Sequence, residues 1–259
     1  MTQTSLVRNL AMVCVAGVVA AIFSPVAHAQ TSQTSFVAAK PVWVADRQTE
    51  KNLFVGFRAD FDCPLQGRPI VRITASSLYR LYVNGQFVGH GPARGPHGWS
   101  RVDEWPVQSF VRQRGNVVAV EVAGYNANSY YLLDEPAFVQ AEAVCDGAIL
   151  ASTAGGGAAF DATVLKHRVQ KVQRYSFQRP FIEYYRMQTG NDSWWDRPIM
   201  ETDKVPLATV PARNLLVRRV AYPEFLTRQP IRVLSEGTLQ QDVPVANLWK
   251  DRSLVNIGP

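Results

Sequence analysis

Apolar and polar residues alternate in short segments from about residue 41 to residue 163, and the segments are bounded by Gly, Pro, Asn or Asp. Alternation with a period of two is typical of strands that bury one face. The pattern predicts strands at residues 53–61, 70–75, 78–83, 86–89, 117–123, 138–145 and 149–153. No segment keeps a helical apolar period, so we expect little helix. Short strands at this spacing predict an all-β chain built as an antiparallel β-sandwich.

The Asn84-Gly85 pair is the clearest turn signal in the chain. Both residues tolerate the positive φ that a type I′ turn requires, so the pair predicts a tight hairpin between strands 78–83 and 86–89. Glycine and proline then recur up to residue 98, which predicts an irregular loop. That loop ends on Trp99, Arg101 and Asp103. On a sandwich, such a loop is expected to face a ligand or a partner domain.

The pattern changes beyond residue 163. Residues 164–175 and 181–187 predict further strands on either side of a break at Arg179-Pro180. Proline becomes frequent from residue 196 onward, which indicates an extended connector with short strands. We therefore divide the chain into a signal peptide at 1–29, a polar leader at 30–40, the β-sandwich at 41–163 and a strand-containing, Pro-rich connector at 164–259.

The first 29 residues have the features of a secretory signal sequence. Arg8 precedes an uncharged apolar run at residues 10–23, and Ala27-His28-Ala29 fits a small-x-small cleavage site. Cleavage after Ala29 predicts a periplasmic or secreted protein with no membrane association afterwards. It removes one basic residue and no acidic residue, so the formal net charge falls from +6 to +5. The remaining basic residues are scattered, and no nucleic-acid partner is expected.

Two cysteines, Cys63 and Cys145, lie beyond the predicted cleavage site. Each continues the inward-facing phase of its strand, so both thiols are expected to point into the core. An exported protein permits a disulfide between them, and two buried free thiols fit the same pattern.

The run from Tyr79 to Arg94 reads YRLYVNGQFVGHGPAR. It resembles the N-terminal β-sandwich of bacterial α-L-rhamnosidases of glycoside hydrolase family 78, where Tyr-x-x-Tyr-Val-Asn-Gly-x-x-Val-Gly-x-Gly-Pro-x-Arg is typical. The likeness continues at residues 121–133 and 168–186. The inner Tyr-Val-Asn-Gly-x-x-Val-Gly part also resembles the sugar-binding jelly roll of β-galactosidase-type enzymes. The resemblance implies a jelly-roll, galactose-binding-like sandwich.

Glycoside hydrolysis requires two carboxyl groups across the bond that is cleaved. The acidic residues considered are Asp103, Glu104, Asp134, Glu135, Asp192, Asp196 and Glu201, and none lies in a recognisable catalytic motif. The resemblance implies that the catalytic acids of family 78 lie in an (α/α)6 barrel after the sandwich. Twelve helices and their loops need about 170 residues, whereas 47 Pro-rich residues follow Ala212. We therefore expect no catalytic residue here and a catalytic barrel outside this chain.

The histidines and cysteines show no metal-ligand spacing, so neither a metal nor another cofactor is expected. Residues suited to sugar recognition are aromatic, for stacking, or polar, for bonding hydroxyls. The candidates are Trp99, Tyr125, Tyr130 and Tyr131 for stacking, and Arg101, Asp103, Asn126 and Asn128 for hydroxyls. Docking against the missing catalytic domain and internal packing are alternative roles for the same residues.

The sequence thus predicts a non-catalytic N-terminal module of an exported α-L-rhamnosidase-like glycoside hydrolase, which acts as a scaffold or as a carbohydrate-binding surface. The parent enzyme is expected to hydrolyse terminal α-L-rhamnose from glycans. The expected partner is a rhamnose-containing glycan or the missing catalytic domain. The alternative is a stand-alone periplasmic protein that binds carbohydrate or a protein partner.

Overall fold

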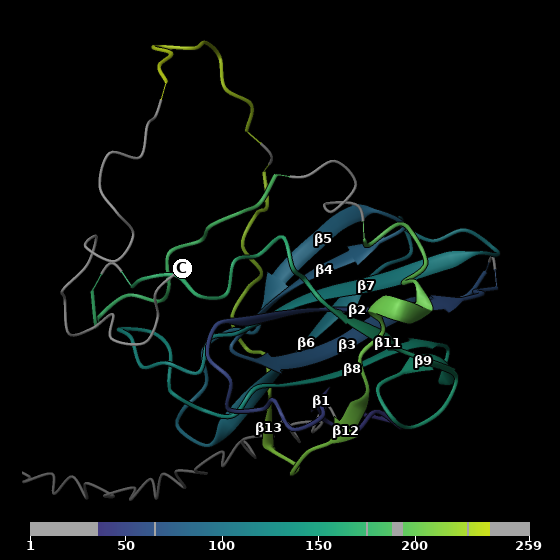
Figure 1. Cartoon of the computed structure of the whole chain (residues 1–259). Coiled ribbons are helices and arrows are strands. Elements are labelled where there is room, and N and C mark those ends of the chain that lie inside the picture. Colours follow the sequence, from purple (N-terminus) through teal and green to yellow (C-terminus); the bar gives the residue numbers. More distant parts are fainter. Residues whose placement is uncertain (1–35, 65, 175, 188–193, 227, 239–259) are drawn as a thin grey trace, which may run out of the picture. The chain divides into compact units, whose positions relative to one another are not determined.

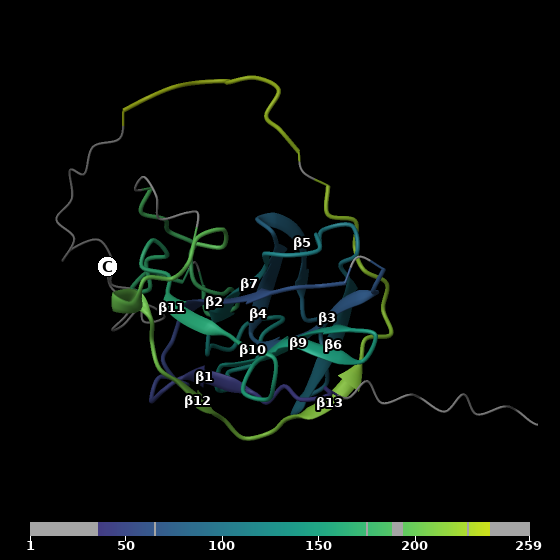
Figure 2. The same cartoon turned by 90° about the vertical axis from the view of Figure 1, so that its right-hand side faces the viewer.

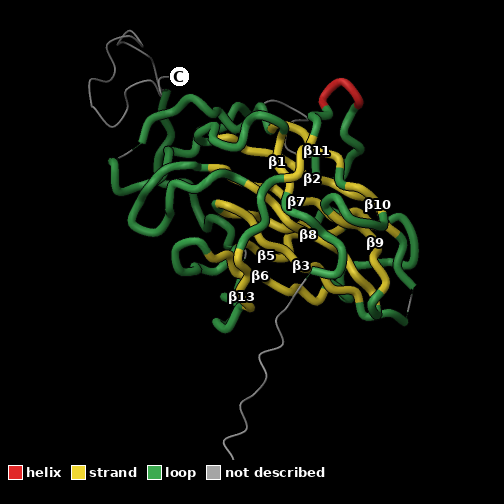
Figure 3. The backbone as a smooth tube through the Cα atoms, turned by 90° about the horizontal axis from the view of Figure 1, so that it is seen from below, coloured by secondary structure: helices red, strands yellow, loops and turns green. Residues whose placement is uncertain are grey.

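The computed structural model of the chain describes residues 36–64, 66–174, 176–187, 194–226 and 228–238. The predicted signal sequence lies outside these residues. Within them the strands form two facing sheets, as the upper and lower groups of arrows in Figure 1 show. Helix is limited there to one short 3-10 turn, Glu201–Asp203, drawn in red in Figure 3. No helix in the described part of the chain is long and apolar enough to cross a bilayer.

The first sheet is fully antiparallel. Its strands lie in the order β11 (Asp161–Val164), β2 (Leu53–Phe61), β7 (Asn116–Gly124), β4 (Leu78–Val83) and β5 (Gln86–Gly91). Every residue of the central strand β7 is buried. One face of this sheet packs on the sandwich core, while Phe54 and Ala123 on the other face pack under Leu165, Val172 and Phe181. The segment after β11 therefore covers the outer face of the sheet.

The second sheet lies in the order β10 (Ala158–Ala159), β9 (Ala148–Ser152), β8 (Phe138–Cys145), β3 (Pro69–Ser76), β6 (Trp99–Pro106) and β13 (Asn214–Val217). Strand β1 (Val42–Val44) pairs with β8 and with β12 (Leu207–Thr209), and Figure 2 shows β1 beside β12. The pairs β9/β10 and β6/β13 are parallel, and the other pairs are antiparallel.

The core between the sheets is built from large apolar side chains. Trp43 and Phe57 are fully buried, with ring centroids 5.8 Å apart. Ile73 and Leu81 are likewise fully buried in the same cluster. Each such side chain stabilises the fold by about 2 kcal/mol through the apolar surface that it removes from water.

The predicted sandwich and its hairpin are confirmed. Strands β2, β4 and β8 coincide with the predicted segments, and the other predicted strands between residues 70 and 153 differ by one or two residues at one or both ends. Asn84 and Gly85 have φ values of 50° and 77°, and Val83 pairs with Gln86 across them. The two-residue turn therefore has positive φ at both positions, as type I′ requires.

Two predictions of local structure were wrong. The loop after Gly89 was expected to run as far as Asp103, but Trp99–Pro106 forms strand β6. Residues 164–175 and 181–187 were expected to form strands. Beyond Val164 they form isolated bridges, Arg168 with Tyr185 and Arg174 with Phe181. Their apolar residues pack on the outer face of the first sheet instead of extending it.

The Pro-rich connector contributes directly to the second sheet. Its strands β12 and β13 pair with β1 and β6, respectively. Cys63 and Cys145 are both buried in the core, as predicted, and both are free thiols with sulfur atoms 3.7 Å apart.

Candidate functional site

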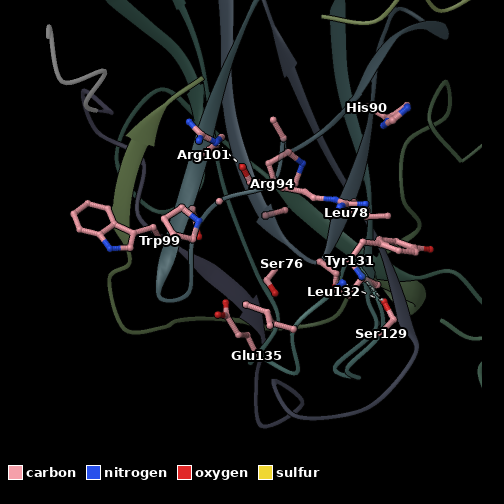
Figure 4. Close-up of a pocket in the computed structure, with 18 of the residues that line it drawn as sticks. Ser76, Leu78, His90, Arg94, Trp99, Arg101, Ser129, Tyr131, Leu132 and Glu135 are labelled. Carbon is pink, nitrogen blue, oxygen red and sulfur yellow. Dashed lines mark hydrogen bonds between the residues drawn. The ribbon is translucent and has the colours of Figure 1, made fainter. Parts of the chain in front are cut away.

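A cleft of about 470 Å³ opens where several chain segments meet (Figure 4). The segments are the junction of β3 and β4, the end of β5 with the loop that follows it, the start of β6, and the loop after β7. Their contributing residues are 75–78, 90–96, 99–101 and 129–135, with gaps. The strands are anchored in the sandwich, and the connecting loops form the walls. This arrangement places recognition groups on loops above a rigid scaffold.

Side-chain hydrogen bonds hold the loop after β7 in place. Ser129 Oγ accepts hydrogen bonds from the backbone N–H groups of Tyr131 at 3.3 Å and Leu132 at 3.1 Å. Asn128 Oδ1 accepts another from the N–H of Asp134 at 2.9 Å. Serine and asparagine stabilise turns in this way. The loop is therefore a defined wall of the cleft.

The loop on the opposite wall lies close to the start of β6. A Cβ atom on Gly95 would lie 2.6 Å from the carbonyl oxygen of Trp99, so only glycine allows this approach. Arg101 Nε donates to the carbonyl of Arg94 at 2.5 Å, which ties the loop to β6.

Aromatic rings lie along both walls. Trp99 is 42% exposed and Tyr130 is 69% exposed. Figure 4 shows Trp99 and Tyr131 on opposite sides of the cleft. The guanidinium of Arg94 lies over the Tyr131 ring, 5.4 Å from its centroid. Exposed rings beside polar groups can stack on a ligand face while the polar groups bond its edge.

The polar groups of the cleft are arginines, serines, one histidine and one carboxylate. Burial lowers the pKa of His90, and the nearby Arg80 and Arg218 lower it further, so this imidazole is neutral at pH 7. Glu135 is the one acidic side chain among the described residues that line the cleft. A glycosidase needs two carboxyl groups across the scissile bond. The described lining residues supply one carboxyl group, together with guanidinium and hydroxyl groups that can hydrogen-bond a ligand.

No protein-family model and no curated protein matches this sequence. Among solved structures, the GH78 family rhamnosidase of Bacillus sp. GL1 matches with a TM-score of 0.63 and 24% identity over 71% of this chain. The chain has the fold of part of a family 78 rhamnosidase. The α-L-rhamnosidase of Aspergillus terreus matches 67% of this chain with a TM-score of 0.49 and 18% identity. The chain covers 20% and 21% of these two proteins, and thus about one fifth of their length.

Four of the eight predicted sugar-contact residues line the cleft of this rhamnosidase-type sandwich: Trp99, Arg101, Tyr130 and Tyr131. The placement of Asp103 differs from the prediction, because β6 turns this side chain inward and leaves it fully buried. Its carboxylate accepts a hydrogen bond from the Tyr79 hydroxyl and forms an ion pair with Arg218 at 3.1 Å. Burial raises the pKa of Asp103, against the opposite effects of Tyr79 and Arg218.

The other three predicted residues also lie away from the cleft. Asn126 is buried, and its Nδ2 donates to the carbonyls of Gln48 at 2.6 Å and Glu50 at 3.2 Å. Tyr125 is buried against Phe54 in an edge-to-face contact with centroids 5.8 Å apart. Asn128 is exposed, and its side chain stabilises the loop rather than facing the cleft.

A second cavity of about 170 Å³ shares Leu78 and His90 with the cleft. Its floor is charged: the buried Glu121 lies 3.3 Å from Arg168 Nε and 3.5 Å from Arg80. Burial raises the pKa of Glu121, while both arginines lower it. The Arg168 guanidinium also lies over the Phe54 ring, 3.9 Å from its centroid. This network fixes the covering segment on the sheet.

Sequence reasoning did not select Arg94, Ser129 and Glu135 as site residues, although all three line the cleft. Arg94 is the last residue of the motif that begins at Tyr79, and this position in the motif could have identified it as a site residue. The described residues contain no group of three or more His, Cys, Asp or Glu side chains that could hold a metal ion.

Proposed function

We propose that this chain is the N-terminal, non-catalytic module of an exported α-L-rhamnosidase-like glycoside hydrolase, and that its cleft binds carbohydrate. The observation that carries this proposal is the pairing of exposed rings with polar groups in one cleft of a rhamnosidase-type sandwich. The parent enzyme would hydrolyse terminal α-L-rhamnose from glycans, with its catalytic residues in a domain outside this chain.

The cleft has the groups that recognise a pyranose. Trp99 and Tyr130 are exposed rings that can stack on the C–H side of a sugar. The hydroxyls of Ser100 and Ser129 and the guanidinium of Arg101 line the cleft and can hydrogen-bond the hydroxyls of a sugar. Stacking with a few hydroxyl bonds supports modest affinity, a Kd of about 10⁻³ to 10⁻⁴ M. Such affinity suits a module that keeps an enzyme near its polymeric substrate, because linked sites reinforce one another.

Export is part of the proposal. The features that support it are Arg8, the apolar run at 10–23 and the Ala27-His28-Ala29 site. Together they support export of the mature protein to the periplasm or outside the cell. N-terminal sequencing of protein recovered from these fractions should begin at Gln30, and recovery of the uncleaved chain from the cytoplasm would contradict export.

Sugar binding is tested by titrating L-rhamnose and rhamnose-containing oligosaccharides while recording NMR shifts and tryptophan fluorescence. Trp99→Ala should remove most of the response, because it deletes an exposed stacking ring of the cleft. Phe177→Ala is the matched control, since this exposed ring lines neither cavity. No response at about 30 mM sugar, well above the expected Kd, would reject the binding function.

The non-catalytic assignment has its own test. The purified chain is incubated with an aryl α-L-rhamnoside, and no turnover is expected. Turnover that disappears on Glu135→Gln would show that the cleft is catalytic and would overturn the proposal.

Docking against another domain is a second candidate function. The observation that favours it is the exposure of three apolar side chains within residues 231–234: Ile231 is 97%, Val233 72% and Leu234 81% exposed. Exposed apolar groups of this kind mark surfaces that associate with a partner. Light scattering tests this role: self-association that disappears on Ile231→Ser supports it, and a monomer at high concentration contradicts it.

A further inference from the structure

We infer that the cleft selects an acidic sugar, a pyranose bearing a carboxylate such as a uronic acid, within a rhamnose-containing oligosaccharide. This inference rests on the proposed carbohydrate-binding function and specifies its ligand. It begins with the two arginines of the cleft, Arg94 and Arg101.

Neither cleft arginine forms an ion pair with a carboxylate among the described residues. By contrast, Arg58 on β2 and Arg72 on β3 are paired: Arg58 lies 2.6 Å from Asp60, and Arg72 lies 2.7 Å from Glu104. Arginine is the residue best suited to bidentate carboxylate recognition. The cleft therefore contains two guanidinium groups whose natural partner is not supplied by the described fold.

Both guanidinium groups nevertheless have contacts within the cleft. Arg101 Nε donates to the carbonyl of Arg94 at 2.5 Å, and Nη1 donates to the carbonyl of Val217 at 3.2 Å. The Arg94 guanidinium lies over the Tyr131 ring, 5.4 Å from its centroid. A guanidinium that is already oriented loses less side-chain entropy when it binds a ligand. Arg101 is thus preorganised by two hydrogen bonds, and Arg94 is oriented by its contact with the Tyr131 ring.

The charge of the cleft favours an anion. Against the two arginines it contains the single carboxylate of Glu135, and His90 is neutral at pH 7. Figure 4 shows Glu135 at one end of the cleft, away from Arg94. The field near the arginines is therefore positive, while Glu135 remains able to accept hydroxyl hydrogen bonds at the other end.

A uronic acid combines the features that this arrangement matches. Its ring offers an apolar C–H face to Trp99 or Tyr130, and its planar carboxylate fits a guanidinium fork. A neutral sugar would leave the arginines without a charged partner. A charge-assisted hydrogen bond contributes about 1.5 kcal/mol or more. The acidic form of a sugar should therefore bind at least about tenfold more tightly than its neutral counterpart.

The test compares a disaccharide of L-rhamnose and D-glucuronic acid with its carboxyl-reduced form, which differs only in a CH₂OH group in place of the carboxylate. Both are titrated into the purified chain by calorimetry and NMR. The acidic form should bind at least about tenfold more tightly, and its advantage should shrink when NaCl is raised from about 20 to about 500 mM.

Variants assign the preference to the arginines. Arg94→Gln and Arg101→Gln should each reduce the acid-to-neutral affinity ratio by about fivefold or more, with weaker effects on the neutral disaccharide. Arg94 is exposed, so its replacement should leave the fold intact, which circular dichroism checks. Arg114→Gln is the matched control, because this exposed arginine lies outside both cavities.

The outcomes separate the two proposals. Equal binding of both disaccharides, or a preference that survives in Arg94→Gln and Arg101→Gln, would overturn the acidic-sugar inference and leave carbohydrate binding in place. Binding of neither disaccharide would overturn both.

Discussion

Replacing Arg218 with alanine should destabilise the protein by about 3 kcal/mol at pH 7, because it leaves a buried carboxylate without its ion-pair partner. Asp103 is fully buried on β6, and its Oδ1 lies 3.1 Å from Arg218 Nη1. Arg218 also donates to the carbonyls of Val220 and Ala221, so the substitution additionally loosens the chain after β13. For a protein of this size, 3 kcal/mol corresponds to a fall in Tm of about 6 to 12 °C.

The destabilisation caused by Arg218→Ala should depend on pH. Burial raises the folded-state pKa of Asp103, so its contribution to stability is fully present below the unfolded pKa and is lost as the pH rises through the folded pKa. Removing Arg218 takes away a group that lowers this pKa, so the folded pKa rises further. The penalty of Arg218→Ala should therefore be largest at neutral pH and should shrink towards pH 4.

Urea denaturation followed by tryptophan fluorescence at several pH values measures the penalty. Asp103→Asn in the Arg218→Ala background removes the unpaired charge and should recover part of the loss at pH 7. Arg219→Ala is the control: the neighbouring arginine is exposed, and its replacement should cost less than about 0.5 kcal/mol. A penalty below about 1 kcal/mol that does not vary with pH would refute the reasoning.

Further predictions concern the hairpin and the cysteines. Gly85→Val should lower stability by about 2 kcal/mol, measured by thermal unfolding, because Gly85 has φ of 77° and a β-branched residue resists that region; an unchanged Tm would contradict the turn assignment. Cys63 and Cys145 should form a disulfide when oxidised glutathione accepts their two electrons and leaves as two thiols. Burial raises the pKa of Cys63 to about 11, so this reaction should be slow and should speed up at alkaline pH. The bond would close a span of 82 residues and add about 4 kcal/mol of stability. Thiol titration and Tm measure these effects, and an equal Tm gain in Cys63→Ser would disprove the assignment.

Alternation predicted most of the sandwich because each of these strands has one face on the core. The alternation pattern did not reveal strand β6, because the charged residue Asp103 occupies an inward position there. Asp103 is stable there because of Tyr79 and Arg218, which are 24 and 115 residues away in the sequence. Because these partners are far from Asp103 in the sequence, the residues around Asp103 do not indicate that its carboxylate is buried. The sequence of β6 therefore resembled a polar loop, although the structure buries its carboxylate in a satisfied network.

The prediction of strands after β11 was wrong for a different reason. Its alternating pattern is that of a surface with one apolar face, and such a face can be buried by covering a sheet as well as by joining one. Val172 and Phe181 pack over Phe54 on the outer side of the first sheet. This cover explains why β7 is buried on both faces and why Tyr125, just beyond β7, is inaccessible to a ligand in the cleft. From the sequence alone, Tyr125 and Tyr130 were equivalent candidates.

The Pro-rich connector shapes the cleft as well as the sheet. Strand β13 pairs in parallel with β6, with Leu216 opposite Arg101. Through this pairing the carbonyl of Val217 accepts a hydrogen bond from Arg101 and orients its guanidinium in the cleft. A sandwich ending at residue 163 would lack this carbonyl and the Arg218 anchor that follows it. Arg218→Ala should therefore reduce ligand selectivity as well as stability. Arg218 anchors the end of β13, and β13 supplies the carbonyl of Val217 that orients Arg101.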